Sequence, residues 1–130
     1  MLQQGLQRVP TSAALHHALG LARIRLQQPE LAMESLRRAV ELDPATARYT
    51  YVLAVALHST AQADEAIRRL HEAVKRWPYD REMLMALTSF QLESGKRQDA
   101  QATARKLVAA YPADPQVRVL AEQALGGQSP

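Results

Sequence analysis

The chain has four histidines, the side chains in it that most readily support catalysis or metal binding. His16 and His17 are neighbours on a predicted helix, so their side chains point about 100° apart and cannot chelate one ion from a single face. His58 and His71 fall on separate predicted helices, and none of the four stands at i,i+4 from another histidine or a carboxylate. We therefore expect partly exposed surface histidines rather than a metal site.

Other arrangements that carry chemistry are missing from the sequence as well. There is no cysteine to serve as a nucleophile or thiolate ligand. No glycine-rich phosphate loop occurs, and no serine, histidine and aspartate stand at a spacing that would bring the three together. The sequence predicts a protein that is not an enzyme and that uses no cofactor and no metal.

Basic residues recur in pairs and suggest one kind of binding. The formal net charge is +3, which permits an acidic partner without requiring nucleic acid. Glutamates stand between the basic pairs, and no aromatic residues alternate with them to form a base-stacking platform. The pattern favours a solvated outer helix face with many ion pairs. Nucleic-acid binding through this basic face, which would be the convex side of the molecule, is the weaker alternative. The basic pairs are Arg37-Arg38, Arg68-Arg69, Lys75-Arg76 and Arg105-Lys106.

The elements that hold these residues are set out by prolines. Pro10, Pro44, Pro78 and Pro112 each follow the previous one by 34 residues. A proline cannot occupy a helix interior. Two places after each proline comes a residue whose side chain commonly caps a helix N-terminus: Ser12, Thr46, Asp80 and Asp114. Each proline therefore predicts the end of one helix and the start of the next, repeated along the chain.

The spacing divides the chain into repeat units, each with two helices joined by a short turn. A half unit at 1–12 precedes the first complete unit, which we interpret as a sign that the chain was cut from a longer protein. A final helix would cap the array, and the last residues would form a disordered tail. The predicted segments are 1–12, 13–46, 47–80, 81–114, 115–125 and 126–130.

Several positions repeat in all three complete units. The twentieth position is always alanine and the twenty-eighth always valine, while the eighth is Gly20, Ala54 or Thr88. Small residues at the eighth and twentieth positions let two helix axes approach closely. The second helices carry their apolar residues on one stripe, because residues three and four apart share a helix face. These regularities predict closely packed helix pairs.

The pattern resembles the tetratricopeptide repeat (TPR) family over the whole chain except its last few residues. The matching residues are Leu19-Gly20, Ala32, Leu36, Ala39 and "ELDP" at 41–44 in the first unit, Leu53-Ala54, "DEAI" at 64–67, Leu70, Ala73 and Pro78 in the second, and Leu87, Gly95, Ala100 and Pro112 in the third. The resemblance implies an all-α, right-handed superhelical solenoid of antiparallel helix pairs. The strict period of 34 argues against a pentatricopeptide array.

The sequence also departs from this family. Aromatic residues common at the fourth and eleventh positions are missing, and Thr88, Ala104 and Leu107 are unusual in the third unit. We therefore expect slightly irregular packing in residues 81–114.

The resemblance also implies where a ligand would bind. In this family the first helix of each unit lines a concave groove, and corresponding positions here would form an apolar strip with a polar rim. We expect it to hold an apolar peptide or an amphipathic helix of another protein, unless those residues pack against neighbouring helices instead. His17 and Leu21 replace the lysine and asparagine that clamp a terminal carboxylate in some members. The predicted groove residues are His17, Leu21, Ile24, Arg25, Arg48, Tyr51, Val55, His58, Met85, Ser89 and Leu92, with Val119 extending the row.

Besides nucleic-acid binding, one other role stays open. The array is alternatively a structural or assembly segment of a larger protein, and an orphaned apolar end at 1–12 would then promote self-association. Residues 47–59 are similar to arrays appended to exported bacterial proteins, including multihaem cytochromes, although the chain has no haem-attachment motif. The sequence shows no signal peptide or membrane span. That predicts a cytoplasmic location by default, or a periplasmic one if the parent protein is exported.

Overall fold

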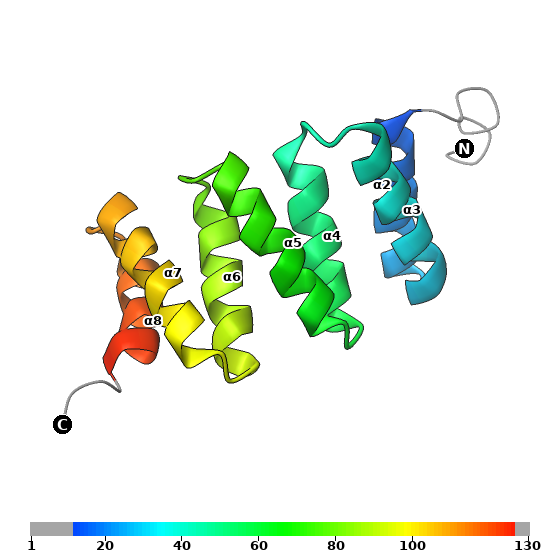
Figure 1. The fold of residues 1–130 in the computed structure, drawn as a ribbon. Helices are drawn as coiled ribbons and strands as arrows, with labels where there is room; N and C mark the ends of the chain where they lie inside the picture. The colour runs from blue at the N-terminus through cyan, green and yellow to red at the C-terminus, as the bar shows by residue number, and fades with distance from the viewer. Residues whose placement is uncertain (1–11, 127–130) are drawn as a thin grey trace. The chain divides into compact units, whose positions relative to one another are not determined.

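The computed structural model describes residues 12–126, and this part of the chain contains seven α-helices and no strand (Figure 1). The chain divides into two compact units, Met1–Ala61 and Gln62–Pro130. From here on these are called the first and the second unit, and the predicted 34-residue segments are called repeat units. The first unit holds α2 (Ala13–Arg25), α3 (Pro29–Leu42) and α4 (Ala47–Ser59). The second holds α5 (Ala63–Arg76), α6 (Arg81–Glu93), α7 (Arg97–Ala110) and α8 (Pro115–Leu125).

These helices confirm the predicted all-α architecture of helix pairs followed by a closing helix. The division of the helices into three repeat units remains a prediction. The half unit predicted at 1–12 lies outside the described residues except for Ser12, and so does the predicted tail after Gly126.

Three of the four predicted N-caps are formed by side chains. Ser12 Oγ accepts a hydrogen bond of 3.2 Å from the backbone amide three residues later. Asp80 Oδ1 accepts the corresponding bond at 3.0 Å. Asp114 Oδ1 accepts from the amides two and three residues later, at 3.0 and 3.3 Å. Each oxygen satisfies amides that have no partner inside the first turn, so α2, α6 and α8 begin where their caps predict.

The prediction that Thr46 caps α4 with its side chain is wrong. Its hydroxyl donates instead to Asp43 Oδ2 at 2.6 Å, and it makes no side-chain cap bond. Asp43 also accepts the backbone amide of Ala45 at 3.2 Å. The charged carboxylate of Asp43 is a strong acceptor for the hydroxyl hydrogen of Thr46, and in this orientation the hydroxyl oxygen accepts no amide from the first turn of α4.

The turn between the two helices of each predicted unit uses one left-handed residue. Gln27, Ala61 and Gly95 have φ angles of 58°, 63° and 75°. The amide after Gln27 bonds the carbonyl of Arg23 at 2.9 Å, and the amide after Gly95 bonds that of Gln91 at 2.8 Å. These bonds close the helix ends in the manner of a Schellman motif. Of the three residues, only Gly95 adopts this backbone without steric cost.

The core of the first unit lies where α3 contacts both α2 and α4. Leu36 and Ala39 of α3 are fully buried, and Leu19 of α2 is nearly so. Gly20 lies directly against Leu36, because a Cβ added at Gly20 would stand 2.6 Å from Leu36 Cδ2. Real Cβ atoms essentially never stand that close to another atom. The absence of a side chain at Gly20 therefore lets α2 and α3 pack closely at this point.

The core of the second unit is organised around α6, which contacts α5, α7 and α8. Leu84 and Leu87 of α6 are almost completely buried, as are Leu107 of α7 and Val117 of α8. A smaller cluster joins α7 to α8 through alanines: Ala104, Ala121 and Ala124. The side chains of α8 therefore complete the apolar core of this unit.

Candidate functional site

The predicted groove residues of α2 occupy one face, because residues 17, 21 and 24 are spaced by three and four. Ile24 is 44% exposed, and Leu21 is half-buried. Arg25 is exposed in the last turn of the helix. This face therefore offers apolar and basic side chains to an incoming molecule. We call this surface the inner face of α2, and we use the same name for the corresponding faces of α4, α6 and α8, each within its own unit.

His17 differs from the other three residues of this face because it is buried, with 9% of its surface exposed. Its ring centre lies 4.7 Å from that of Tyr49. Its Nδ1 atom is buried and has no hydrogen-bond partner among residues 12–126. Burial, and secondly the charge of Arg48, lower the pKa of His17 and so favour its neutral form. The expectation of a partly exposed histidine is wrong for His17, because the ring is buried with Tyr49 of α4 packed against it.

The inner face of α4 carries a similar mixture. Arg48 is exposed in the first turn, Tyr51 is half-buried, and Val55 is 38% exposed. His58 is half-buried in the last turn. In the first unit the structure thus brings Tyr49 of α4 against His17 of α2 and leaves Arg48 and Val55 open to solvent.

The inner face of the second unit contains a hollow of about 520 Å³ between α6 and α8, the α6–α8 hollow. Met85 and Ser89 of α6 are half-buried at its edge, and Val119 of α8 is 57% exposed. Leu92, also predicted to line the groove, packs against the alanine cluster instead and is partly buried there. The hollow is lined by Met85, Ser89, Pro115, Gln116, Val119, Leu120 and Gln123.

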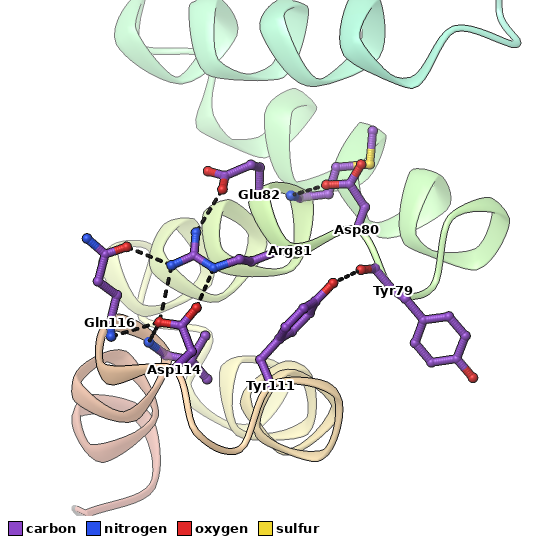
Figure 2. Close-up of polar contacts among 9 residues, drawn as sticks. Tyr79, Asp80, Arg81, Glu82, Tyr111, Asp114 and Gln116 are labelled. Carbon is purple, nitrogen blue, oxygen red and sulfur yellow. Dashed lines mark hydrogen bonds and ion pairs between the residues drawn. The ribbon is translucent and has the colours of Figure 1, made fainter.

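A group of polar contacts holds the start of α8 against the start of α6, beside this hollow (Figure 2). Arg81 Nε donates to Asp114 Oδ2 at 2.6 Å, and its Nη2 donates to Gln116 Oε1 at 2.6 Å. Its Nη1 donates to Glu82 Oε1 at 2.7 Å. We call these four residues the polar clasp. Because Asp114 also caps α8, the clasp fixes both the position and the first turn of that helix.

The clasp changes the ionisation of its members. The hydrogen bond from Arg81 is the main reason that the pKa of Asp114 lies below its ordinary value. Hydrogen bonds to Asp114 and Glu82 likewise raise the pKa of Arg81. In the same region the hydroxyl of Tyr111 donates to the backbone carbonyl of Tyr79, as Figure 2 shows. Sequence analysis missed this cluster, although Asp114 was predicted as a cap.

A second hollow of about 490 Å³ opens between α5 and α7, with α6 at its floor, and we call it the α5–α7 hollow. Apolar residues of α5 and α6 line it together with charged residues of α5 and α7. Thr103 donates to Gln91 Oε1 at 2.8 Å, and both side chains are buried there. The charged residues and the histidine that line the α5–α7 hollow are Asp64, Arg68, His71, Lys96, Asp99 and Lys106. No sequence motif pointed to this hollow.

The basic pairs of α5 follow the predicted ion-pair pattern. Arg69 Nε lies 3.0 Å from Glu65 Oε2, with Arg68 Nη2 3.8 Å from the same oxygen. Lys75 Nζ lies 3.1 Å from Glu72 Oε1. Part of the positive charge on this helix is therefore already balanced by its own glutamates, which weakens the case for a nucleic-acid surface.

Residues 12–126 offer neither a metal-binding cluster nor a membrane-spanning helix. Within that part of the chain, no three histidine or acidic side chains cluster in a way that could hold a metal ion. No described helix combines the length and the apolar character that crossing a membrane requires.

Two sequence models of the tetratricopeptide repeat match the chain, one over residues 57–124 and the other over residues 13–46. The chain belongs to the TPR family. No curated protein sequence matches it. The two family matches together span α2, α3 and the segment from the end of α4 to α8.

Solved structures show the same fold. A crystal structure of MamA is 21% identical, with a TM-score of 0.85 over 98% of this chain and 74% of MamA. PilF of Pseudomonas aeruginosa is 26% identical, with a TM-score of 0.82 over 98% of this chain and 58% of PilF. YrrB, described as a TPR protein with an unusual peptide-binding site, is 22% identical, with a TM-score of 0.75 over 86% of this chain and 57% of YrrB. The chain thus spans less than two thirds of PilF and of YrrB.

Proposed function

We propose that this TPR chain is a non-catalytic protein-interaction module whose inner faces bind an apolar peptide or amphipathic helix. Membership of the family supports an interaction role in general. The observation that carries the finer proposal is the exposure of Ile24, Val55 and Val119, all on predicted groove positions. Ile24 and Val55 belong to the first unit and Val119 to the second, and within each unit exposed large apolar side chains mark a candidate binding surface.

The first unit supports the proposal through the neighbouring faces of α2 and α4. Leu21 and Ile24 lie one helical turn apart, and Tyr51 and Val55 do the same on the other helix. Leu21 and Tyr51 are half-buried, so a ligand could complete their burial. Complete burial of an exposed apolar side chain stabilises a complex by roughly 1.5–3 kcal/mol, and a half-buried side chain contributes only a part of that. Two or three of them would supply the apolar part of a peptide's affinity.

The second unit supports it through the α6–α8 hollow. Its volume of about 520 Å³ suits a few side chains of a bound segment. Met85 gives an adaptable apolar wall, and Ser89, Gln116 and Gln123 offer hydrogen-bonding groups around it. YrrB, which has the same fold, is described as having a peptide-binding site. That likeness supports a peptide ligand and does not locate it.

The test begins with a random peptide library displayed on phage and selected on the full chain. A selected peptide, labelled with a fluorophore, is then titrated by fluorescence anisotropy against the wild type and against Leu21→Asp/Tyr51→Glu. We expect at least a tenfold loss of affinity with the helical circular dichroism spectrum unchanged. Parallel variants, Val55→Asp in the first unit and Met85→Glu in the second, assign the peptide to one inner face.

Arg38→Glu serves as the matched control, since Arg38 is exposed on α3, outside the inner face. It changes the charge of the same unit and should bind with wild-type affinity. Selected peptides that bind all the inner-face variants as tightly as the wild type would refute the proposal.

A further inference from the structure

The inner face of the first unit has a one-sided charge. Helices α2 and α4 contain no aspartate and no glutamate, although they carry three arginines and three histidines. In the second unit α6 has Glu82 and Glu93 beside a single arginine, and α8 has one arginine and one glutamate. The inner faces of the two units therefore present different electrostatic surfaces to a ligand.

Two of the three arginines are available for a ligand. Arg23 is already used, because its Nη1 donates to Ser35 Oγ at 2.9 Å and to the carbonyl of Leu31 at 3.2 Å. Arg25 and Arg48 are exposed, and neither makes a hydrogen bond or ion pair with any residue in the described range 12–126. An arginine that has no carboxylate partner within the protein can form an ion pair with a carboxylate of a bound molecule.

In the sequence the two arginines stand between the exposed apolar residues of α2 and the exposed Val55 of α4. Arg25 is in the last turn of α2, one residue after Ile24. Arg48 is in the first turn of α4 and precedes Val55 by two helical turns. The charge of Arg48 helps to lower the pKa of the buried His17, and no acidic group contributes to that shift. Among residues 12–126, neither arginine is paired with a carboxylate that would balance its charge.

We propose that the inner face of the first unit binds an internal segment of another protein in which aspartate or glutamate side chains accompany apolar ones. The carboxylates would bind Arg25 and Arg48, and the apolar side chains would cover Leu21, Ile24 and Val55. Hydrogen bonds between arginine and carboxylate are about twice as strong as neutral ones. This inference rests on the proposed function and names the chemistry of the ligand.

The partner's carboxylates come from side chains rather than from a chain terminus. Family members that clamp a terminal carboxylate do so with donors at the fifth and ninth positions of a repeat, where this chain has the buried His17 and the apolar Leu21. Arg25 and Arg48 lie instead near opposite ends of their respective helices. Two separated cations suit carboxylates spread along a segment.

The experiment repeats the library selection with peptides fused ahead of the phage coat protein, so that no free carboxyl terminus is present. Selection on the wild type should enrich aspartate and glutamate together with apolar residues. Selection on Arg25→Glu/Arg48→Glu should lose the acidic enrichment, whereas Arg38→Glu should retain it. Unchanged circular dichroism spectra would show that all three proteins are folded.

A selected peptide and its copy with every acidic residue changed to the corresponding amide are then compared by fluorescence anisotropy. We expect the amide copy to bind the wild type at least tenfold more weakly, and the difference to shrink between 20 and 300 mM NaCl as salt screens the charges. Equal affinity of the two peptides, with binding still lost in Leu21→Asp/Tyr51→Glu, would overturn the charge inference and leave the proposed function standing. Binding that survives that double substitution would overturn both. Loss of binding when the carboxyl terminus of the selected peptide is amidated would overturn the assignment to side chains.

Discussion

The α2–α3 pair of the first unit and the α6–α7 pair of the second have the same helix lengths, 13 and 14 residues, but fill the contact between their helices in opposite ways. In the first pair, glycine at position 20 faces the large Leu36. In the second, the corresponding residues are Thr88 and the small Ala104, and both are fully buried. The larger of the two side chains is on the second helix in the first pair and on the first helix in the second pair, so the two positions compensate for each other in size.

A polar contact differs between the same two pairs. Arg23 donates to Ser35 in the first, and Thr103 donates to Gln91 at the corresponding positions of the second. Both contacts join the first helix to the second where the family often has an aromatic residue on the first. The departures in residues 81–114 are therefore paired substitutions, and these residues are as well buried as their counterparts.

The largest effect should follow from removing the large member of the first pair. Leu36→Ala empties a fully buried position, and such substitutions cost about 2–5 kcal/mol of unfolding free energy. Urea denaturation of the full chain, followed by circular dichroism, measures the change. A loss below about 1 kcal/mol would mean that the core around α3 collapses to fill the space and is not held by Leu36.

The next effect tests whether Gly20 and Leu36 act as one unit. Gly20→Ala should gain about 1 kcal/mol of helix propensity but lose more than that, about 1–3 kcal/mol, to the overlap with Leu36. In the Leu36→Ala background the overlap disappears, so the same change should become stabilising. Additive effects in this double-mutant cycle would contradict the compensation that the comparison describes.

Helix caps give a smaller contrast between the two units. Asp80→Ala removes a cap bond from α6 and should lower the unfolding free energy by about 1 kcal/mol. Thr46→Ala removes no cap bond from α4, so it should cost less than half as much. Parallel urea titrations compare the two, and an equal loss would show that the Thr46–Asp43 contact supports α4 as strongly as a direct cap.

The turn residues should respond in opposite directions. Gln27→Gly relieves a left-handed non-glycine residue and should stabilise the chain by roughly 0.5 kcal/mol, after the cost of glycine's freedom in the unfolded chain. Gly95→Ala imposes that strain and should destabilise it by a similar amount. Thermal unfolding of both variants provides the measurement, and shifts of the same sign would contradict the account.

The polar clasp should make the second unit sensitive to acid. Because the pKa of Asp114 is lower in the folded state, its stabilising effect is present above the ordinary aspartate pKa and is lost as pH falls through the lowered value. Asp114→Asn should therefore reduce the melting temperature at pH 7 and have little effect near pH 2. Glu122→Gln, on the exposed side of α8, is the control, and a pH-independent difference for Asp114→Asn would exclude the linkage.

Much of the fold could be predicted because its signals are local. Prolines end the helices, and Ser12, Asp80 and Asp114 start new ones through bonds to amides two or three residues away. Thr46 was mispredicted because the carboxylate of Asp43, three residues before it, accepts the hydroxyl hydrogen and orients the hydroxyl away from the helix amides. Nothing in a helix-cap pattern decides which of two nearby partners a hydroxyl selects.

The site was less predictable because burial depends on neighbouring helices. His17 is on a predicted groove position, but Tyr49 of α4 covers it. Leu92 has the spacing of a groove residue, yet it packs against alanines from α7 and α8. The α5–α7 hollow and the polar clasp likewise form only when residues of separate helices meet.

The central claim, that the inner faces bind a peptide, is tested most directly by photo-crosslinking. A selected peptide that carries a benzoylphenylalanine at one of its apolar positions is bound to the full chain and irradiated, and the crosslinked residues are identified by mass spectrometry. We predict crosslinks to α2 and α4, or to α6 and α8, at residues such as Ile24, Val55, Met85 or Val119. Crosslinks confined to α5 and α7, around the α5–α7 hollow, would contradict it.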